Sequence, residues 1–233
     1  MRSIVDTIRR LVEEGVEVAV AFSRAGLEVA RIYGVLDKLL AIVPSSEYGG
    51  VSLGEKPGFY PYTCWVASRR INIVVIAPAT SNTVAKIVHG IADTLPTAVA
   101  LQALKSGVPL AILPTDYGEV CITELPCYVD TDRCVGCGAC IAACPYNAIH
   151  ILEYRGRKRA RIDYAQCRGT ALCLDACSYG AIKCWERAIV TPSKIDLENL
   201  EKLKQLKNVF VAKSITELEE YIHRTLEPDQ RTP

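Results

Sequence analysis

Residues 134–145 read CVGCGACIAACP, in which four cysteines are separated by two, two and three residues and are followed by a proline. With this spacing, Cys134, Cys137 and Cys140 can hold one iron–sulfur cubane while Cys144 reaches a neighbouring cluster. Zinc is the alternative, but it needs only four ligands, typically in two separated pairs, and would leave other thiols here unexplained. The stretch therefore predicts iron–sulfur clusters.

A second copy of the motif follows, because CPYNAIHILE at 144–153 matches CSYGAIKCWE at 177–186 position for position. The cysteines of the two copies also correspond: Cys167 to Cys134, Cys173 to Cys140 and Cys177 to Cys144. If the fourth cysteine of each copy crosses over, the first cluster is bound by Cys134, Cys137, Cys140 and Cys177, and the second by Cys144, Cys167 and Cys173. The repeat predicts a two-cluster α+β domain of the bacterial ferredoxin type.

The second cluster lacks one thiolate, since Thr170 stands where the first copy has Cys137. A hydroxyl is a poor iron ligand, so we expect an empty corner and a 3Fe-4S cluster, or a 4Fe-4S cluster with an exogenous or non-cysteine ligand. Cys184 could compensate, but it matches Ile151 in the repeat and alternates with Ile182 along a predicted strand, which favours core packing. The cysteines without ligand spacing are interpreted in the same way: Cys64, Cys121 and Cys127.

On both sides of this cysteine-rich segment, the sequence alternates between helical and strand patterns, which predicts an α/β domain with a parallel sheet. Helices are predicted at 3–14, at 25–40 with a break at Gly34, at 62–70 and 81–93, before Gly107, at 196–207 and at 214–224. Strands are predicted at 16–22, 71–78, 108–114 and 208–213, and a long Gly- and Pro-rich loop at 44–61. We expect a host domain in two pieces, 1–129 and 187–226, around an inserted domain at 130–186, with a flexible tail at 227–233.

The composition of the 233 residues, 50% apolar and 23% charged, is that of a folded globular protein and excludes disordered, collagenous and coiled-coil classes. A net charge of +1 provides no long-range attraction to nucleic acid or to an anionic membrane. The amino terminus lacks the apolar region of a signal peptide and no apolar run approaches the length of a membrane span, so we expect a cytoplasmic protein. In that reducing compartment, eleven cysteines indicate metal or redox chemistry rather than disulfides.

Five cations fall within seven residues between the two copies of the motif: Arg155, Arg157, Lys158, Arg159 and Arg161. The simpler interpretation is a solvated hairpin tip beside Gly156. The alternative is a docking site for an acidic redox partner, such as a ferredoxin or another one-electron donor. Nucleic-acid binding is less favoured, because no aromatic residues or binding motif accompany the cluster.

Residues 77–95 read APATSNTVAKIVHGIADTL and run from a strand end through small polar residues into a helix. Such a turn offers amide donors to an anion or a flavin edge. The stretch resembles the PASANT motif of the flavin-containing cysteine decarboxylase superfamily. Within it, SRAGLEVARIYG at 23–34 and the closing segment at 196–222 are most similar to the archaeoflavoproteins, which include archaeal dihydromethanopterin reductases with a ferredoxin insertion.

The resemblance implies a flavodoxin-like parallel sheet flanked by helices, bound FMN and a homo-oligomer built from trimers. It also implies that Ser23 lies near the phosphate, although a plain helix N-cap is the alternative for this serine. The family normally opens with a strand and a glycine-containing turn that contacts FMN, and because this chain begins in the following helix we expect one wall of the phosphate pocket to be missing. The other FMN-site residues that the resemblance implies are Pro78, Ala79, Thr80, Ser81, Asn82 and Thr83.

These parts predict an iron–sulfur flavoprotein oxidoreductase, in which clusters carry single electrons to FMN and FMN reduces an acceptor. The resemblance implies that the acceptor is the C=N bond of dihydromethanopterin, with Asn82 or a protein-bound water helping to place a proton. The alternative is a ferredoxin-like electron carrier on a degenerate flavin fold. A decarboxylase is less favoured, because decarboxylases of the superfamily use an active-site histidine and none of His89, His150 and His223 lies in the expected loop.

Overall fold

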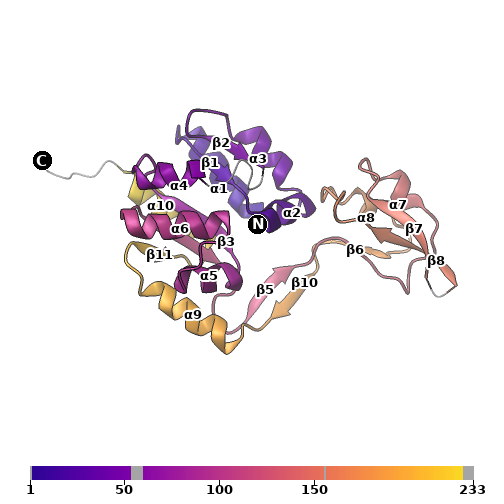
Figure 1. The fold of residues 1–233 in the computed structure, drawn as a ribbon. Coiled ribbons are helices and arrows are strands. Elements are labelled where there is room, and N and C mark those ends of the chain that lie inside the picture. Colours follow the sequence, from indigo (N-terminus) through magenta and orange to yellow (C-terminus); the bar gives the residue numbers. More distant parts are fainter. Residues whose placement is uncertain (1, 54–59, 155, 228–233) are drawn as a thin grey trace, which may run out of the picture. The chain divides into compact units, whose positions relative to one another are not determined.

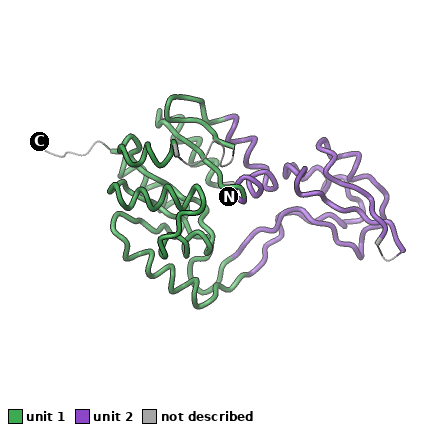
Figure 2. Tube along the Cα trace, in the orientation of Figure 1, with its two compact units in different colours: residues 1–24, 42–121, 190–233 green, residues 25–41, 122–189 purple. Residues whose placement is uncertain are grey.

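A computed structural model describes residues 2–53, 60–154 and 156–227 (Figure 1). The chain divides into two compact units, and each is described by itself (Figure 2). Unit 1 comprises residues 1–24, 42–121 and 190–233, and unit 2 comprises residues 25–41 and 122–189. The stretch 25–41, which we expected in the host domain, groups here with the cysteine-rich segment. The domain boundaries derived from the sequence stay predictions.

The centre of unit 1 is a parallel sheet of three strands in the order β11, β4, β3. These are β3 (Val74–Ala79), β4 (Leu110–Pro114) and β11 (Val209–Val211), and Leu110 lies opposite both Val74 and Val209. The strands are almost wholly apolar, as expected where helices cover both faces of a parallel sheet. A second parallel pair joins β1 (Ala19–Ala21) to β2 (Gly50–Ser52).

Helices pack on both faces of the three-stranded sheet, and the alternation along β4 separates two cores. Leu110 and Ile112 belong to a core with residues of α4 (Tyr60–Ala67), α5 (Ser81–Val88), α6 (Leu95–Ser106) and α9 (Lys194–Lys204). Ala111 belongs to another core with residues of α1 (Arg2–Glu13) and α10 (Ile215–Leu226). All three β4 residues are completely buried. The layering agrees with the α/β fold predicted from the sequence.

Local signals fix several helix ends at the predicted positions. Gly107 ends α6 with a φ of 70°, in the left-handed region that glycine adopts without a steric penalty. The Ser214 hydroxyl accepts a hydrogen bond from the Glu217 amide at the start of α10, as the predicted capping box requires. The Glu217 carboxylate, however, accepts from the amide of Lys213 rather than from that of Ser214.

A predicted break in a helix is observed, whereas a predicted loop contains a strand. The stretch 25–40 is divided at Gly34, whose φ is 64°, into α2 (Arg24–Ile32) and α3 (Leu36–Ile42), as the sequence predicted. The stretch 44–61 was predicted as a loop, but it contains β2, because main-chain hydrogen bonding to β1 does not require a run of apolar side chains. Residues 54–59 of that stretch lie outside the described residues.

The strands between Cys121 and Val190 form pairs, and they lie in unit 2 apart from these two end residues, which belong to unit 1. Strand β5 (Cys121–Glu124) pairs with β10 (Arg187–Val190), β6 (Tyr128–Val129) pairs with β9 (Ile182–Lys183), and β7 (Ile149–Tyr154) forms a hairpin with β8 (Arg157–Ile162). The short helices α7 (Ala139–Ala142) and α8 (Leu172–Asp175) occupy equivalent places in the two sequence repeats. The core between these elements consists largely of cysteine, alanine and isoleucine. Across the described ranges, no helix has the length and apolar character needed to cross a membrane.

Candidate cofactor sites

Four cysteines from both repeats line one cavity of unit 2. Its walls include Cys134, Cys137, Cys140 and Cys177, the four residues that the cross-over rule assigns to the first cluster. The loop between the first two is tight, with Gly136 at a φ of 70°, and the cysteines at its ends differ in exposure: Cys134 is buried and Cys137 is exposed. The chain thus brings four thiols from two distant segments around one space, as a cubane requires.

Backbone amides donate to two of these sulfurs. The Ala160 amide, on β8, lies 3.3 Å from the sulfur of Cys134, and the Ala181 amide lies 3.3 Å from that of Cys177. Hydrogen bonds to sulfur stabilise the thiolate form and influence the reduction potential of a cluster. Strand β8 and the residue that directly precedes β9 therefore supply hydrogen-bond donors to the ligand atoms.

A second cavity lies among the remaining ligands. Its lining includes Cys144, Cys167 and Cys173 together with Thr170 and Cys127. Thr170 is exposed and contributes only a hydroxyl. The second cavity therefore offers three predicted thiolate ligands and, unexpectedly, the sulfur-bearing residue Cys127.

Burial, and after it the charge of Cys167, raises the pKa of the Cys173 thiol to about 11. The pKa of Cys140 is also raised, first by burial and then by Cys134. Thiols packed this closely resist ionisation unless a cation compensates their charge, and iron supplies that cation. The donor sets of both cavities therefore fit iron–sulfur clusters.

Cys127 and Cys184 form a disulfide that links the strands flanking the two repeats. They directly precede β6 and follow β9, and the pairing of Tyr128 with Lys183 places them opposite each other. We expected both to be free cysteines of the core: both lie in or against the core of unit 2, but they are bonded to each other, because the pairing of two distant strands brings them together. The symmetry of the sequence was an available signal, since each lies seven positions outside an outer ligand, Cys134 or Cys177.

In unit 1, the turn from β3 to α5 contains the residues predicted to line the flavin site. Pro78 and Ala79 end the strand, and Thr80 caps α5, its hydroxyl accepting from the Thr83 amide at 3.4 Å. The first amides of a helix have no partner inside it, so Ser81 and Asn82 present amide donors at this end. Asn82 is exposed.

The neighbouring strand adds two residues that the sequence analysis missed. Thr115 follows β4, and its amide donates to the Ala79 carbonyl at 2.8 Å. The carboxylate of Asp116 accepts from the Ser81 hydroxyl at 2.6 Å and from the Thr115 hydroxyl at 2.9 Å. The carboxyl ends of adjacent parallel strands meet at one edge of a sheet. Thr115 and Asp116 directly follow the strand predicted at 108–114, and this position in the sequence could have identified them as neighbours of the turn.

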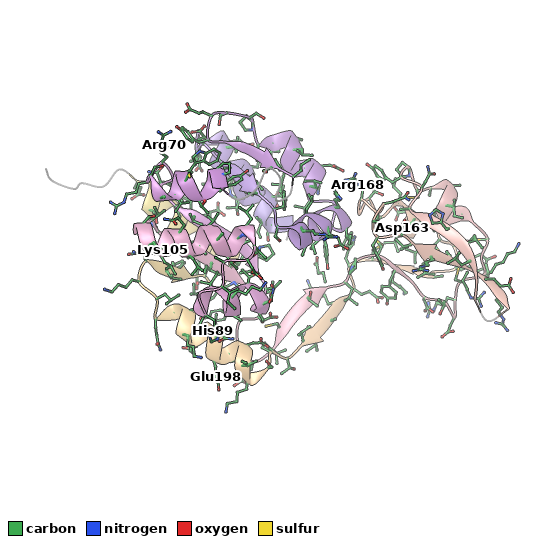
Figure 3. All side chains as sticks on the ribbon, viewed as in Figure 1. Arg70, His89, Lys105, Asp163, Arg168 and Glu198 are labelled. Atoms are coloured by element: carbon green, nitrogen blue, oxygen red, sulfur yellow. A yellow bond between two sulfur atoms is a disulfide. The ribbon has the colours of Figure 1, made fainter. Side chains whose placement is uncertain are left out.

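Ser23 lies between β1 and α2 and is half-buried. The three histidines lie on different elements of the two units. His89 ends α5 and is exposed (Figure 3), His150 lies in the β7–β8 hairpin, and His223 on α10 lies 3.5 Å from the Glu14 carboxylate. The structure therefore brings no histidine to the β3–α5 turn within the described residues.

Residues 1–121, more than half of the chain, match the model of the family described as Flavoprotein. The chain belongs to the Flavoprotein family. Residues 133–181 match the 4Fe-4S dicluster domain. These two matches confirm the predicted cofactor classes, a flavin and iron–sulfur clusters, and they confirm the predicted combination of an α/β flavoprotein fold with a ferredoxin-type domain.

Two curated relatives of this Flavoprotein-family chain are named dihydromethanopterin reductase (acceptor). The one from Methanocaldococcus jannaschii is 37% identical over 153 residues, which is 64% of this chain and 62% of the relative. The one from Methanosarcina mazei is 37% identical over 130 residues, 54% of each chain. The alignments thus span between about half and three fifths of these relatives. The resemblance predicted from the motifs is confirmed.

A solved structure has the same fold at low sequence identity. Burkholderia xenovorans DmrB, in complex with FMN and described as a cubic protein cage for redox transfer, superimposes with a TM-score of 0.53 and 22% identity. The superposition covers 90% of this chain and 81% of DmrB. At this identity the comparison supports the flavodoxin-like fold of the Flavoprotein family.

The described basic residues of this cluster lie on β8, which begins at the tip of the β7–β8 hairpin. Arg157, Arg159 and Arg161 alternate along β8, with Ala160 between the last two. Arg155 lies outside the described residues. Because alternate residues of a strand point to opposite faces, the three arginines lie on the face of β8 opposite Ala160, which is buried. The solvated hairpin tip stays a prediction: Arg157 and Lys158 are exposed at the start of β8, and the basic face continues along the strand.

Proposed function

We propose that this chain is an iron–sulfur flavoprotein oxidoreductase, which takes single electrons from a ferredoxin-type donor and delivers them to dihydromethanopterin. The observation that carries the proposal is that one chain combines two thiol-lined cavities with the β3–α5 turn. Clusters transfer one electron at a time, whereas a flavin can hold one or two, so the combination suits the reduction of a two-electron acceptor.

We propose that the β3–α5 turn binds the ring system of FMN rather than its phosphate. The Asp116 carboxylate, 2.6 Å from the Ser81 hydroxyl, adds a negative charge where a phosphate would otherwise find the positive end of α5. A carboxylate repels phosphate but accepts a hydrogen bond from a ring N–H group. The amides of Ser81 and Asn82 are donors for ring carbonyl oxygens. Ser23 stays our candidate for the phosphate end, and Pro78, Ala79, Thr80 and Thr83 shape the turn.

The proposed acceptor is suggested by the names of the curated relatives and by the chemistry of the site. Reduction of a C=N bond takes a hydride equivalent and a proton, and the exposed Asn82 amide can hold a water or a ring nitrogen where that proton is delivered. Asn82 is therefore the proposed catalytic residue. No histidine at the turn is required for this reaction, in contrast to a decarboxylase.

For the electron donor, we propose an acidic one-electron carrier that docks on the basic face of β8. Ala160 donates its amide to the Cys134 sulfur, so this strand adjoins the first cluster cavity. Arg159 and Arg161 flank Ala160 and point to the opposite face. Complementary charge accelerates such brief encounters without requiring a large interface. We further propose a homo-oligomer, suggested by the cage that DmrB forms, and a cytoplasmic location.

Replacing Asn82 by alanine is expected to weaken FMN binding and acceptor reduction while leaving iron unchanged. Loss of one hydrogen bond to an uncharged flavin atom costs about 0.5 to 1.5 kcal/mol, or up to roughly tenfold in affinity. The measurement is FMN retained per chain on dilution, together with iron content. His89→Ala, at the exposed far end of α5, is the matched control and should retain FMN fully.

If neither the original chain nor His89→Ala binds FMN, the chain is a ferredoxin-like carrier and the proposed function is wrong. If His89→Ala abolishes reduction of the acceptor while FMN stays bound, His89 takes part in the reaction, as the active-site histidine of a decarboxylase would. Equal FMN retention and equal acceptor reduction in Asn82→Ala and the original protein would remove Asn82 from the site.

A further inference from the structure

We propose that Cys127 is the fourth thiolate ligand of the second cluster, and that its disulfide with Cys184 withholds it. With the disulfide closed, the second site has three thiolates and holds a three-iron cluster. With the disulfide open, Cys127 completes the ligand set of a four-iron cluster. The inference rests on the dicluster match and the second cavity, not on the proposed reaction, so the two can fail separately.

Cys127 lies beside the second cluster site. It lines the second cavity together with Cys144, Cys167 and Cys173, whereas Cys184 is not among the lining residues. Its sulfur lies within 4.8 Å of the sulfurs of both Cys173 and Cys184. One sulfur is thus close to a cluster ligand and to a disulfide partner, which is the arrangement that an exchange between the two requires.

Cys127 also differs from Thr170, the residue at the expected ligand position. Thr170 is exposed and offers oxygen, whereas Cys127 is only 3% exposed and offers sulfur. The main chain also ties Cys127 to the second ligand loop, because its carbonyl accepts from the Tyr164 hydroxyl at 2.9 Å, three positions before Cys167. A buried thiol that is tethered to the ligand loop is better placed to complete the site.

The change between the two states balances with a dithiol as the reductant. The dithiol gives two electrons and two protons to the Cys127–Cys184 bond and becomes a disulfide, leaving two thiols in the protein. A second dithiol molecule gives one electron to each of two three-iron clusters and two protons to solvent as it becomes a disulfide, and each reduced cluster accepts one Fe²⁺ ion. Cys127 then loses its proton to solvent and its sulfur binds that iron, while Cys184 keeps its proton.

The test compares Cys127→Ala with Cys184→Ala, because both variants remove the disulfide but only the first removes the proposed ligand. Each is purified anaerobically, and iron content and the electron paramagnetic resonance spectrum of the oxidised protein are measured. We expect Cys184→Ala to hold about eight iron atoms per chain without a three-iron signal. We expect Cys127→Ala to hold about seven iron atoms per chain and to keep the three-iron signal after treatment with dithiothreitol and Fe²⁺. Before treatment with dithiothreitol and Fe²⁺, the original protein should hold about seven iron atoms and show the three-iron signal. After the treatment it should hold about eight and lose that signal.

Identical iron contents and spectra in the two variants would overturn the proposal, since the pair would then serve only to link strands. Thr170→Cys added to Cys127→Ala distinguishes a missing ligand from a damaged fold. The added thiolate, at the position that the first repeat uses, is expected to restore about eight iron atoms and remove the three-iron signal. Failure of the double variant to regain iron would mean that Cys127 is needed for folding, and this too would contradict the ligand assignment.

Discussion

The double variant Cys134→Ala, Cys140→Ala is expected to lose about four iron atoms per chain and to stop passing electrons from a one-electron donor to the flavin. Both residues are buried walls of the first cavity, and their loss leaves only Cys137 and Cys177 there. Two thiolates do not hold a cubane. The flavin turn belongs to the other compact unit, so FMN content should stay unchanged. Iron analysis and the visible spectrum measure the loss.

The matched control is Cys64→Ala, Cys121→Ala, which also removes two thiols, but from unit 1 and outside both cavities. It should retain all the iron. Unchanged iron in the first double variant would contradict the ligand assignment. Loss of iron with normal flavin reduction would mean that the first cluster is not on the electron path.

Gly136→Ala is expected to destabilise the first cluster loop strongly. An added Cβ would lie 2.7 Å from both Cβ and the carbonyl oxygen of Lys158, and the φ of 70° is already unfavourable for alanine. The backbone conformation costs about 1 to 2 kcal/mol and the overlap about 1 to 3 kcal/mol more. We expect the cluster absorbance to be lost at a lower denaturant concentration, or the cluster not to assemble.

Gly138→Ala separates the two costs, because Gly138 has a φ of 84° but an added Cβ meets no atom within 4 Å. Only the backbone cost, about 1 to 2 kcal/mol, should remain, so its denaturation midpoint should lie between those of Gly136→Ala and the original protein. Equal midpoints for the two variants would show that the contact with β8 does not constrain the loop.

The sequence was most informative where the constraint is local. The spacing of Cys134 to Cys144 is dictated by the size of a cubane, and the turn at Thr80 by the capping needs of α5. The position of Gly107 after an apolar helix similarly determined the end of α6. Each of these features lies within about ten to twelve consecutive residues, so a single window of the sequence contains its signal.

Features that depend on distant segments were missed. Asp116 lies 35 positions after Ser81, and the two are neighbours only because β3 and β4 pair in parallel. Cys127 and Cys184, separated by 57 positions, meet only through the pairing of β6 with β9. Strand β2 was predicted as loop because its partner strand, rather than its own sequence, defines it. Register between distant strands is not encoded in any single window of the sequence.

The central claim is that electrons move from the clusters to the flavin and then to the acceptor, and an anaerobic titration with a one-electron reductant tests it most directly. With both clusters and FMN bound, the chain should take up about four electrons, one for each cluster and two for the flavin. Addition of dihydromethanopterin should then reoxidise flavin and clusters together, in two-electron steps. Two results would contradict this order of electron transfer. In the first, neither the flavin nor the clusters are reoxidised by dihydromethanopterin. In the second, the flavin stays oxidised while the clusters are fully reduced.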